Sequence, residues 1–141
     1  MKTQYLNKPI NAILLCLFAF FYTNNLQAQC TGDVYIPDAN FKIVLINNAA
    51  INTNNDAEIQ CSEAAAYTGV LNVANNNIAS LTGIQAFTSI TELNCSNNLL
   101  QFLYLNLNAA LIKIDCSGNR LIDLDVTENL ALSELVCFSN L

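Results

Sequence analysis

The chain has 141 residues, of which 53% are hydrophobic and 11% are charged, a composition typical of one globular domain and not of a disordered chain. It contains no histidine, which excludes the ordinary Ser–His and Cys–His catalytic triads and removes the commonest metal ligand. Its formal net charge of −6 argues against binding to nucleic acid or anionic lipid by general electrostatic attraction.

Residues 1–28 have the organisation of a secretory signal peptide. Lys2 and Lys8 precede an apolar run over residues 10–22, and the small residue Ala28 ends the segment. This run is shorter than the roughly 20 apolar residues of a membrane span. We therefore expect cleavage after Ala28 and a secreted product, in the periplasm, at the cell surface or outside the cell, with no membrane insertion. Three basic and eleven acidic residues then leave a net charge of −8.

Residues 29–67 are predicted to form a small helical cap for the repeats that follow. Asp38 precedes Phe41, Val44 and Leu45, whose spacing indicates a short amphipathic helix with Asp38 as its N-cap. A second helix is expected at residues 62–67. Stacked repeats need such a terminal element to cover the open end of their core.

Between these helices, residues 52–63 resemble the twelve-residue calcium loop of EF-hand and dockerin modules. The resemblance implies these ligands: Asn52, Asn54, Asp56, Glu58 through its backbone carbonyl, and Glu63. The match is degraded because the first ligand is Asn where Asp is usual, and because Ala57 stands where Gly makes the sharp turn. A left-handed Ala costs roughly 1–2 kcal/mol. Calcium is thus a candidate cofactor of weak affinity, about 10⁻⁴ to 10⁻³ M, and a cap loop without calcium is the alternative.

The second half of the chain repeats one phrase. L-N-C-S-N-N at residues 93–98 returns as I-D-C-S-G-N at 114–119 and as L-V-C-F-S-N at 135–140, with a looser copy, L-N-V-A-N-N, at 71–76. Steps of 21 and 22 residues indicate stacked repeats.

This pattern resembles leucine-rich repeats, and the variant with Cys in the strand is similar to that of secreted Bacteroidetes (flavobacterial) and internalin-like proteins. The resemblance covers residues 68–141, about three and a half repeats. It implies an α/β leucine-rich-repeat solenoid with a parallel β-sheet on its concave face and a helical N-terminal cap. Such proteins usually continue to a C-terminal cap or sorting domain, so we expect a chain that stops at Leu141 to be truncated.

The first and third residues of each phrase point the same way on a strand and are expected in the core. They are Leu71, Val73, Leu93, Cys95, Ile114, Cys116, Leu135 and Cys137. The asparagine that ends each phrase falls where the strand turns, and its amide can satisfy backbone groups of neighbouring repeats. This predicts an asparagine ladder of Asn76, Asn98, Asn119 and Asn140.

Five cysteines remain after the expected cleavage, so at least one is unpaired or pairs between chains. Cys30 and Cys61 both fall in the cap, and we expect them to close a loop of about 30 residues by a disulfide. A lipid anchor on Cys30 is the alternative, although Gln29 stands where a lipoprotein signal has a small residue. Three further cysteines lie on neighbouring strands with parallel side chains, a geometry that hinders disulfides: Cys95, Cys116 and Cys137.

The remaining strand residues form outward columns that meet solvent or a ligand. One column alternates in charge, as cross-strand pairing prefers: Val70, Glu92, Lys113 and Glu134. Another holds Ala74, Ser96, Ser117 and Phe138. The least charge-paired part of the face is predicted to bind a ligand: Asn72, Asn94, Asp115, Val136 and Phe138.

We interpret the chain as a secreted module for protein–protein interaction or adhesion, with a protein or peptide partner, and not as an enzyme. Asp115, Asp123 and Asp125 fall on different sides of one repeat, which argues against a pair of catalytic carboxylates. The alternatives are a non-catalytic, carbohydrate-targeting portion of a larger secreted enzyme, with a glycan ligand, and an architectural spacer. Phe138 is the one aromatic residue of the outward columns, which disfavours a glycan on that face.

Overall fold

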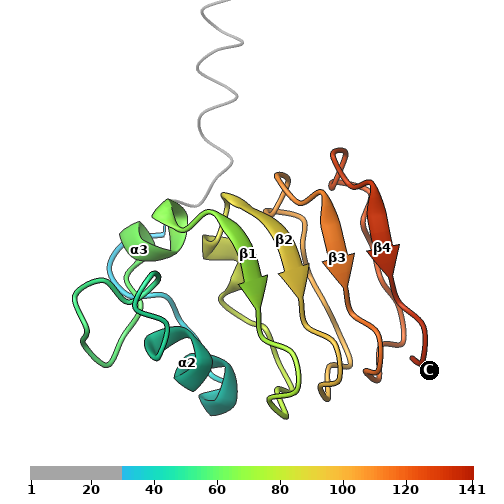
Figure 1. Cartoon of the computed structure of the whole chain (residues 1–141), viewed down its shortest axis with the longest axis horizontal. Coiled ribbons are helices and arrows are strands. Elements are labelled where there is room, and N and C mark those ends of the chain that lie inside the picture. Colours follow the sequence, from blue (N-terminus) through green and yellow to red (C-terminus); the bar gives the residue numbers. More distant parts are fainter. Residues whose placement is uncertain (1–29) are drawn as a thin grey trace, which may run out of the picture.

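The computed structural model describes residues 30–141, so the expected signal peptide at residues 1–28 lies outside the described residues. The elements follow in the order α2 (Ala39–Ile46), α3 (Cys61–Ala66), β1 (Gly69–Asn72), η1 (Ile84–Ala86), β2 (Ile90–Asn94), β3 (Lys113–Asp115) and β4 (Glu134–Val136). The two α-helices lie beside β1 at one end of a parallel sheet whose strands stand in chain order (Figure 1). No helix among residues 30–141 is long and apolar enough to cross a membrane.

The sheet register follows the repeat of the sequence. Leu71 pairs with Leu93, Leu93 with Ile114, and Ile114 with Leu135, all in parallel. An irregularity between Gly69 and Val70 shifts the pairing of β1 with β2, where the sequence step is 22 residues and not 21. Parallel strands that recur at steps of 21 or 22 residues make this an α/β repeat fold.

Helix α2 begins where the sequence predicts, because Asp38 caps it. Oδ1 of Asp38 accepts hydrogen bonds of 3.0 Å from the backbone N–H groups of Asn40 and Phe41. Phe41 and Leu45 are fully buried and fix the helix to the core.

Helix α3 begins at Cys61 and ends at Ala66, one residue earlier at each end than predicted. The reason is a capping box in which Gln60 is the N-cap residue. The Glu63 carboxylate accepts a hydrogen bond of 3.1 Å from the backbone N–H of Gln60, and the Gln60 side chain caps the Glu63 backbone.

The inward columns are buried in the first three strands and partly exposed in the last. Leu71, Leu93 and Ile114 are at most 1% exposed. Leu135, by contrast, is 39% exposed, and Cys137 is also exposed, so the expectation that both lie in the core is wrong. Strand β4 has a neighbouring strand on one side only, which leaves the other side of these side chains uncovered.

The asparagine ladder is confirmed from Asn98 onward. Nδ2 of Asn98 donates to the carbonyls of Val73 and Cys95, at 2.9 and 3.0 Å, and its Oδ1 accepts from the backbone N–H groups of Asn76 and Ile78. Asn119 and Asn140 donate in the same way one and two coils later, and Oδ1 of each accepts from one backbone N–H, that of Leu100 and of Leu121. Asn76 differs, since its amide donates within its own turn, to the carbonyl of Ala74.

A second ladder, not predicted from the sequence, stands on the return side of the coils. Nδ2 of Asn108 donates to the carbonyls of Ile84 and Phe87, each at 2.9 Å. Nδ2 of Asn129 makes the equivalent bonds one coil later. The second and third coils are therefore each joined to the preceding coil by buried amides at two places.

A column of left-handed residues also escaped the sequence analysis. It follows the strands at the same step and comprises Asn75, Asn97, Gly118 and Ser139, with φ of 61°, 53°, 64° and 56°. Asn and Gly tolerate this conformation better than other residues do. The turn after each strand therefore depends on this position as well as on the ladder.

Candidate functional site

The predicted binding residues form a row across the sheet. Asn72 pairs with Asn94, Asn94 with Asp115, and Asp115 with Val136, so the four occupy one level of four adjacent strands. Phe138 lies outside this row, two residues beyond Val136, and is 68% exposed.

Three residues of the row also hold the turn that follows each strand. Oδ1 of Asn72, Asn94 and Asp115 accepts a hydrogen bond of 3.1 Å from the backbone N–H two residues later. Such Asx turns redirect the chain out of the strand. The amide nitrogen of Asn94 and Oδ2 of Asp115 have no partner among residues 30–141 and remain available to a ligand.

The column of Ser96 and Ser117 is not exposed, contrary to expectation. Both residues are buried, and their hydroxyls donate to Oδ1 of Asn94 and Asp115 at 2.7 and 2.6 Å. The serine hydroxyls therefore hold the side chains of Asn94 and Asp115 in place and are not exposed to a ligand. Phe138, at the same level of β4, is the exposed member of this column.

The charged column pairs across strands in part. Lys113 and Glu134 form an ion pair of 2.8 Å between β3 and β4. The hydrogen bond and the charge of Glu134 raise the pKa of Lys113. Both groups are well exposed, so this pair contributes little to stability.

The calcium candidates of the cap loop are bonded to one another and to the backbone. Both oxygens of the Glu63 carboxylate accept hydrogen bonds, from the backbone of Thr53, Asn54 and Gln60 and from the Thr53 hydroxyl. Glu58 pairs with Lys42. The Asn52 amide is buried and donates to the carbonyls of Ile46 and Asp56.

This arrangement does not fit calcium. Oδ1 of Asn54 accepts from the backbone N–H of Asp56, which fixes the orientation of the amide. Its nitrogen consequently faces Oδ2 of Asp56 and Oε1 of Gln60, where a cation would need oxygen atoms. The left-handed residue of the loop is Asn55, and Ala57 is not left-handed, so the expected strain at Ala57 is absent. Residues 30–141 contain no group of three or more Cys, Asp or Glu placed to hold a metal ion.

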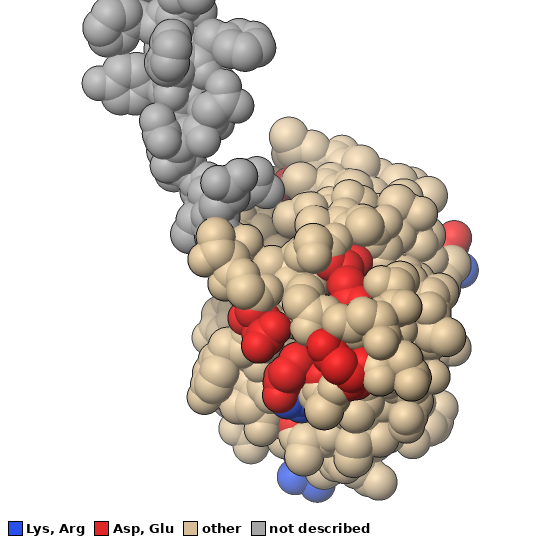
Figure 2. All heavy atoms as spheres, turned by 90° about the vertical axis from the view of Figure 1, so that its left-hand side faces the viewer, with Lys and Arg blue, Asp and Glu red and all other residues tan. Residues whose placement is uncertain are grey.

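Hydrogen bonds to these carboxylates favour their ionised forms. The backbone N–H of Glu58 is the main cause of the lowered pKa of Asp56. Burial raises the pKa of Glu63, but hydrogen bonds from Gln60, Thr53 and Asn54 outweigh it and lower the value overall. Acidic side chains gather over this end of the molecule (Figure 2), a charge that disfavours anionic ligands.

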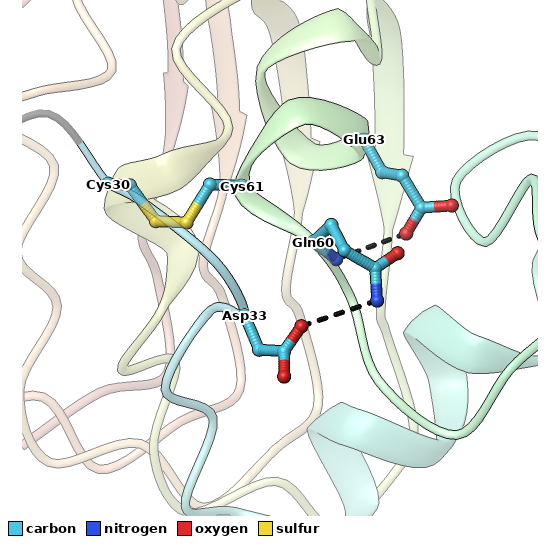
Figure 3. The surroundings of a disulfide bond; sticks show 5 residues. All are labelled: Cys30, Asp33, Gln60, Cys61 and Glu63. Atoms are coloured by element: carbon cyan, nitrogen blue, oxygen red, sulfur yellow. Dashed lines mark hydrogen bonds between the residues drawn. A yellow bond between two sulfur atoms is a disulfide. The ribbon is translucent and has the colours of Figure 1, made fainter.

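The cap is closed by a disulfide between Cys30 and Cys61, with Cα atoms 5.5 Å apart (Figure 3). Beside it, Asp33 forms an antiparallel bridge with Gln60, and the Gln60 amide donates to the Asp33 carboxylate at 3.3 Å. The chain N-terminal to α2 is thereby tied to the start of α3.

The three remaining described cysteines are free thiols. Cys95 and Cys116 are buried, and Cys137 is exposed. Burial raises the pKa of Cys116 to about 11, with a smaller contribution from Cys137, and burial also raises that of Cys95. Both buried thiols therefore remain protonated and unreactive at neutral pH.

An exposed aromatic pair lies away from the predicted surface, and the sequence analysis missed it. Phe102 and Tyr104 are 54% and 65% exposed, and their rings are parallel within 2° with centroids 6.3 Å apart. The available signal was two aromatic residues at outward positions, between the inward Leu100, Leu103 and Leu105.

No protein-family model matches the sequence, and no curated protein is significantly similar to it. Several solved structures are similar. The functional domain of InlJ from Listeria monocytogenes, which includes a cysteine ladder, is 34% identical over 74% of this chain with a TM-score of 0.65. The internalin InlF from the same organism is 22% identical over 81% of the chain, with a TM-score of 0.68.

A structure of the CBM51-2 and INT domains of ZmpB from Clostridium perfringens is 17% identical over 78% of the chain, with a TM-score of 0.54. The chain spans 22%, 34% and 23% of the length of these three proteins. The internalin neighbours and the parallel sheet together show a leucine-rich-repeat-like fold.

Proposed function

We propose that the chain is a secreted leucine-rich-repeat solenoid module that binds a protein or peptide partner through the outward face of β1 to β4. The observation that carries this proposal is the row of Asn94, Asp115 and Val136 on adjacent strands. It turns an amide nitrogen, a carboxylate oxygen and a half-buried apolar side chain to the same side, with the exposed Phe138 beyond them. The internalin neighbours support an interaction or adhesion module.

This face suits a macromolecule better than a small ligand. Parallel strands about 4.8 Å apart form a broad surface, and protein interfaces combine apolar anchors with a polar rim over such areas. Residues of the outward columns can also change without disturbing the buried columns behind them.

The rest of the chain serves this role in the proposal. Residues 1–28 direct secretion, residues 29–67 cap the solenoid, and residues 68–141 form the repeats. N-terminal sequencing of the secreted product should begin at Gln29, and a product that begins at Met1 would contradict secretion by a cleaved signal. Lipid on Cys30 would revive the anchored alternative and would also be incompatible with the Cys30–Cys61 disulfide.

The partner-binding role can be tested with substitutions that keep the turns intact. In Asn94→Asp, Asp115→Asn and Phe138→Ala combined, both Asx turns retain an accepting Oδ1, while the charge pattern and the aromatic anchor of the face change. Proteins retained by the immobilised wild-type chain are compared with those retained by the triple variant. The control is Tyr35→Ala, which removes an aromatic side chain that is 76% exposed in the cap.

The expected result is a set of proteins retained by wild type and Tyr35→Ala and lost from the triple variant, with unchanged circular dichroism. Retention of the same set by all three proteins would contradict the assignment to the strand face. If the set is lost when the cap loop at residues 52–63 is altered instead, the cap is the recognition element.

A further inference from the structure

A second surface lies on the return segments of the coils, across the core from the strand face. A hollow of about 490 Å³ lies between the segments that follow β1 and β2, where Ser80, Thr82 and Gln85 face Gln101, Phe102 and Tyr104. Figure 1 shows these return segments behind the strands. Gln85 links the two coils, because its amide donates to the carbonyl of Tyr104 at 3.2 Å.

The fold itself does not require aromatic residues at this place. Positions 102 and 104 point outward, since the neighbouring Leu103 and Leu105 are buried. In the preceding coil the same two positions are Ser80 and Thr82, and in the following coil they are Asp123 and Asp125. The parallel bridge between Tyr104 and Asp125 confirms that these positions correspond.

Two large aromatic rings that are more than half exposed lie at positions where neighbouring coils carry small or charged residues, so the core does not require them. Contiguous exposed apolar surface rimmed by polar residues can mark a ligand-binding groove. The rings are parallel, with centroids 6.3 Å apart, so together they present one aromatic surface to a ligand.

Polar groups border the rings on both sides. The first hollow brings hydroxyl and amide side chains and the exposed Arg120 to one side of Tyr104. A second hollow of about 360 Å³ lies on the other side, where Tyr104 meets Asn106, Asp125 and Glu128. Oδ1 of Asp125 accepts bonds from Thr127, and its other oxygen has no partner among residues 30–141.

From this arrangement we propose that the Phe102–Tyr104 groove binds a neutral oligosaccharide, with sugar rings lying on the two aromatic side chains. The C–H face of a sugar ring packs on an aromatic face, while its hydroxyl groups donate to and accept from amide, carboxylate and guanidinium side chains. One basic and two acidic residues border the rings, a balance that favours an uncharged ligand.

An apolar peptide side chain fits this place less well. It would need a buried apolar pocket, but the leucines beneath the groove, Leu81 and Leu103, are each 4% exposed and already packed in the core. The proposal is independent of the strand face, since no residue is shared between the two surfaces.

The test uses native electrophoresis through gels containing one neutral polysaccharide each, namely β-glucan, galactomannan, xyloglucan or arabinoxylan, with alginate as the anionic control. Calorimetry with an oligosaccharide of the retarding polymer then measures the affinity. The variants are Phe102→Ser, Tyr104→Thr and the pair combined. They reproduce the residues of the preceding coil at the same positions, so the fold accepts them, and thermal unfolding checks this.

At least one neutral polysaccharide should retard the wild-type protein, and each single variant should weaken oligosaccharide binding by at least about tenfold. The matched control Tyr35→Ala removes an exposed aromatic residue from the cap and should bind as wild type does. The proposal is overturned if no neutral polysaccharide retards the protein, or if the double variant is retarded equally. It is overturned too if Tyr35→Ala alone abolishes retardation, which would place sugar binding on the cap.

Discussion

Oδ2 of Asp38 accepts a hydrogen bond of 2.8 Å from the backbone N–H of Ala79, which lies 41 residues further along the chain. The same oxygen accepts a second bond, of 3.0 Å, from Ser80, while Oδ1 caps helix α2. One carboxylate thus fixes both the start of the cap helix and the position of that helix against the first coil.

Replacing Asp38 should therefore destabilise the protein more than loss of an ordinary N-cap does. Removal of a cap costs about 1 kcal/mol, and two further backbone donors lose their partner, so we expect Asp38→Ala to lower the free energy of unfolding by roughly 2–3 kcal/mol. Urea denaturation measures this. Glu128→Ala, which removes an exposed carboxylate, should change stability by less than about 0.5 kcal/mol, and equal effects of the two would refute the linkage.

The ladder residue Asn119 should be a sensitive polar position of the repeats. Asn119→Ala leaves the N–H of Leu100 without its partner and removes one of the two amide donors to each of the carbonyls of Cys95 and Cys116. The expected loss is about 3 kcal/mol of unfolding free energy, against a negligible loss for the exposed Asn106→Ala. A loss below about 1 kcal/mol would mean that water replaces the amide.

The left-handed conformation of Ser139 predicts that one substitution at this position will stabilise the protein. Ser139 has φ of 56°, a conformation that Gly adopts without strain, so Ser139→Gly should raise stability by up to about 1 kcal/mol. Gly118→Ala is the counterpart, because its Cβ would lie 2.5 Å from Oδ1 of Asn97, and it should be destabilising. Thermal unfolding of both variants measures the two shifts, and shifts of the same sign would contradict the argument.

Thiol accessibility should separate the cysteines into three classes. In the chain that begins at Gln29, a thiol reagent should modify Cys137 at once, and Cys95 and Cys116 only after unfolding. Cys30 and Cys61 should react only after reduction. Their crosslink contributes about 3–4 kcal/mol by the chain-entropy estimate, so mild reduction should lower the melting temperature. Mass spectrometry that found a bridge among the other three cysteines would contradict this pattern.

Acid should loosen the cap. Asp56 and Glu63 have lowered pKa values in the folded chain, so the unfolded chain binds protons more readily. Their stabilisation is present above the unfolded values of about 4 and is lost as the pH falls through the folded values. Glu63→Gln should lower the melting temperature at neutral pH and reduce its further fall in acid. An unchanged acid response in this variant would exclude Glu63 as a contributor.

The repeat could be predicted from the sequence because its signal is redundant. Leu93, Cys95 and Asn98 each recur at the same step, so strand register, buried columns and the first ladder all follow from one period. The Asp38 cap was predictable for the same reason, since the residue type and the apolar spacing after it agree.

Other features depend on hydrogen bonds that the repeat pattern of the sequence does not specify. The burial of Ser96 arises from its bond to Asn94, where the pattern alone makes it an outward residue. The cap loop matched calcium spacing, but the amide orientation of Asn54 depends on a backbone bond that spacing does not specify. Phe102 and Tyr104 could not be predicted from the repeat, because they occupy outward positions where the residue type changes from one coil to the next.

The uniform register also determines how the chain gains and loses its structure. Each pairing of neighbouring strands closes a loop of 21 or 22 residues, so the entropy of loop closure is nearly the same at every step. Folding can then proceed as a zipper from the crosslinked cap towards β4, each coil using the previous one as a template. Amide hydrogen exchange should accordingly be slowest around Leu71 and Leu93 and become faster towards Val136. The free energy of opening would then fall along the molecule and would not have one value for the whole chain.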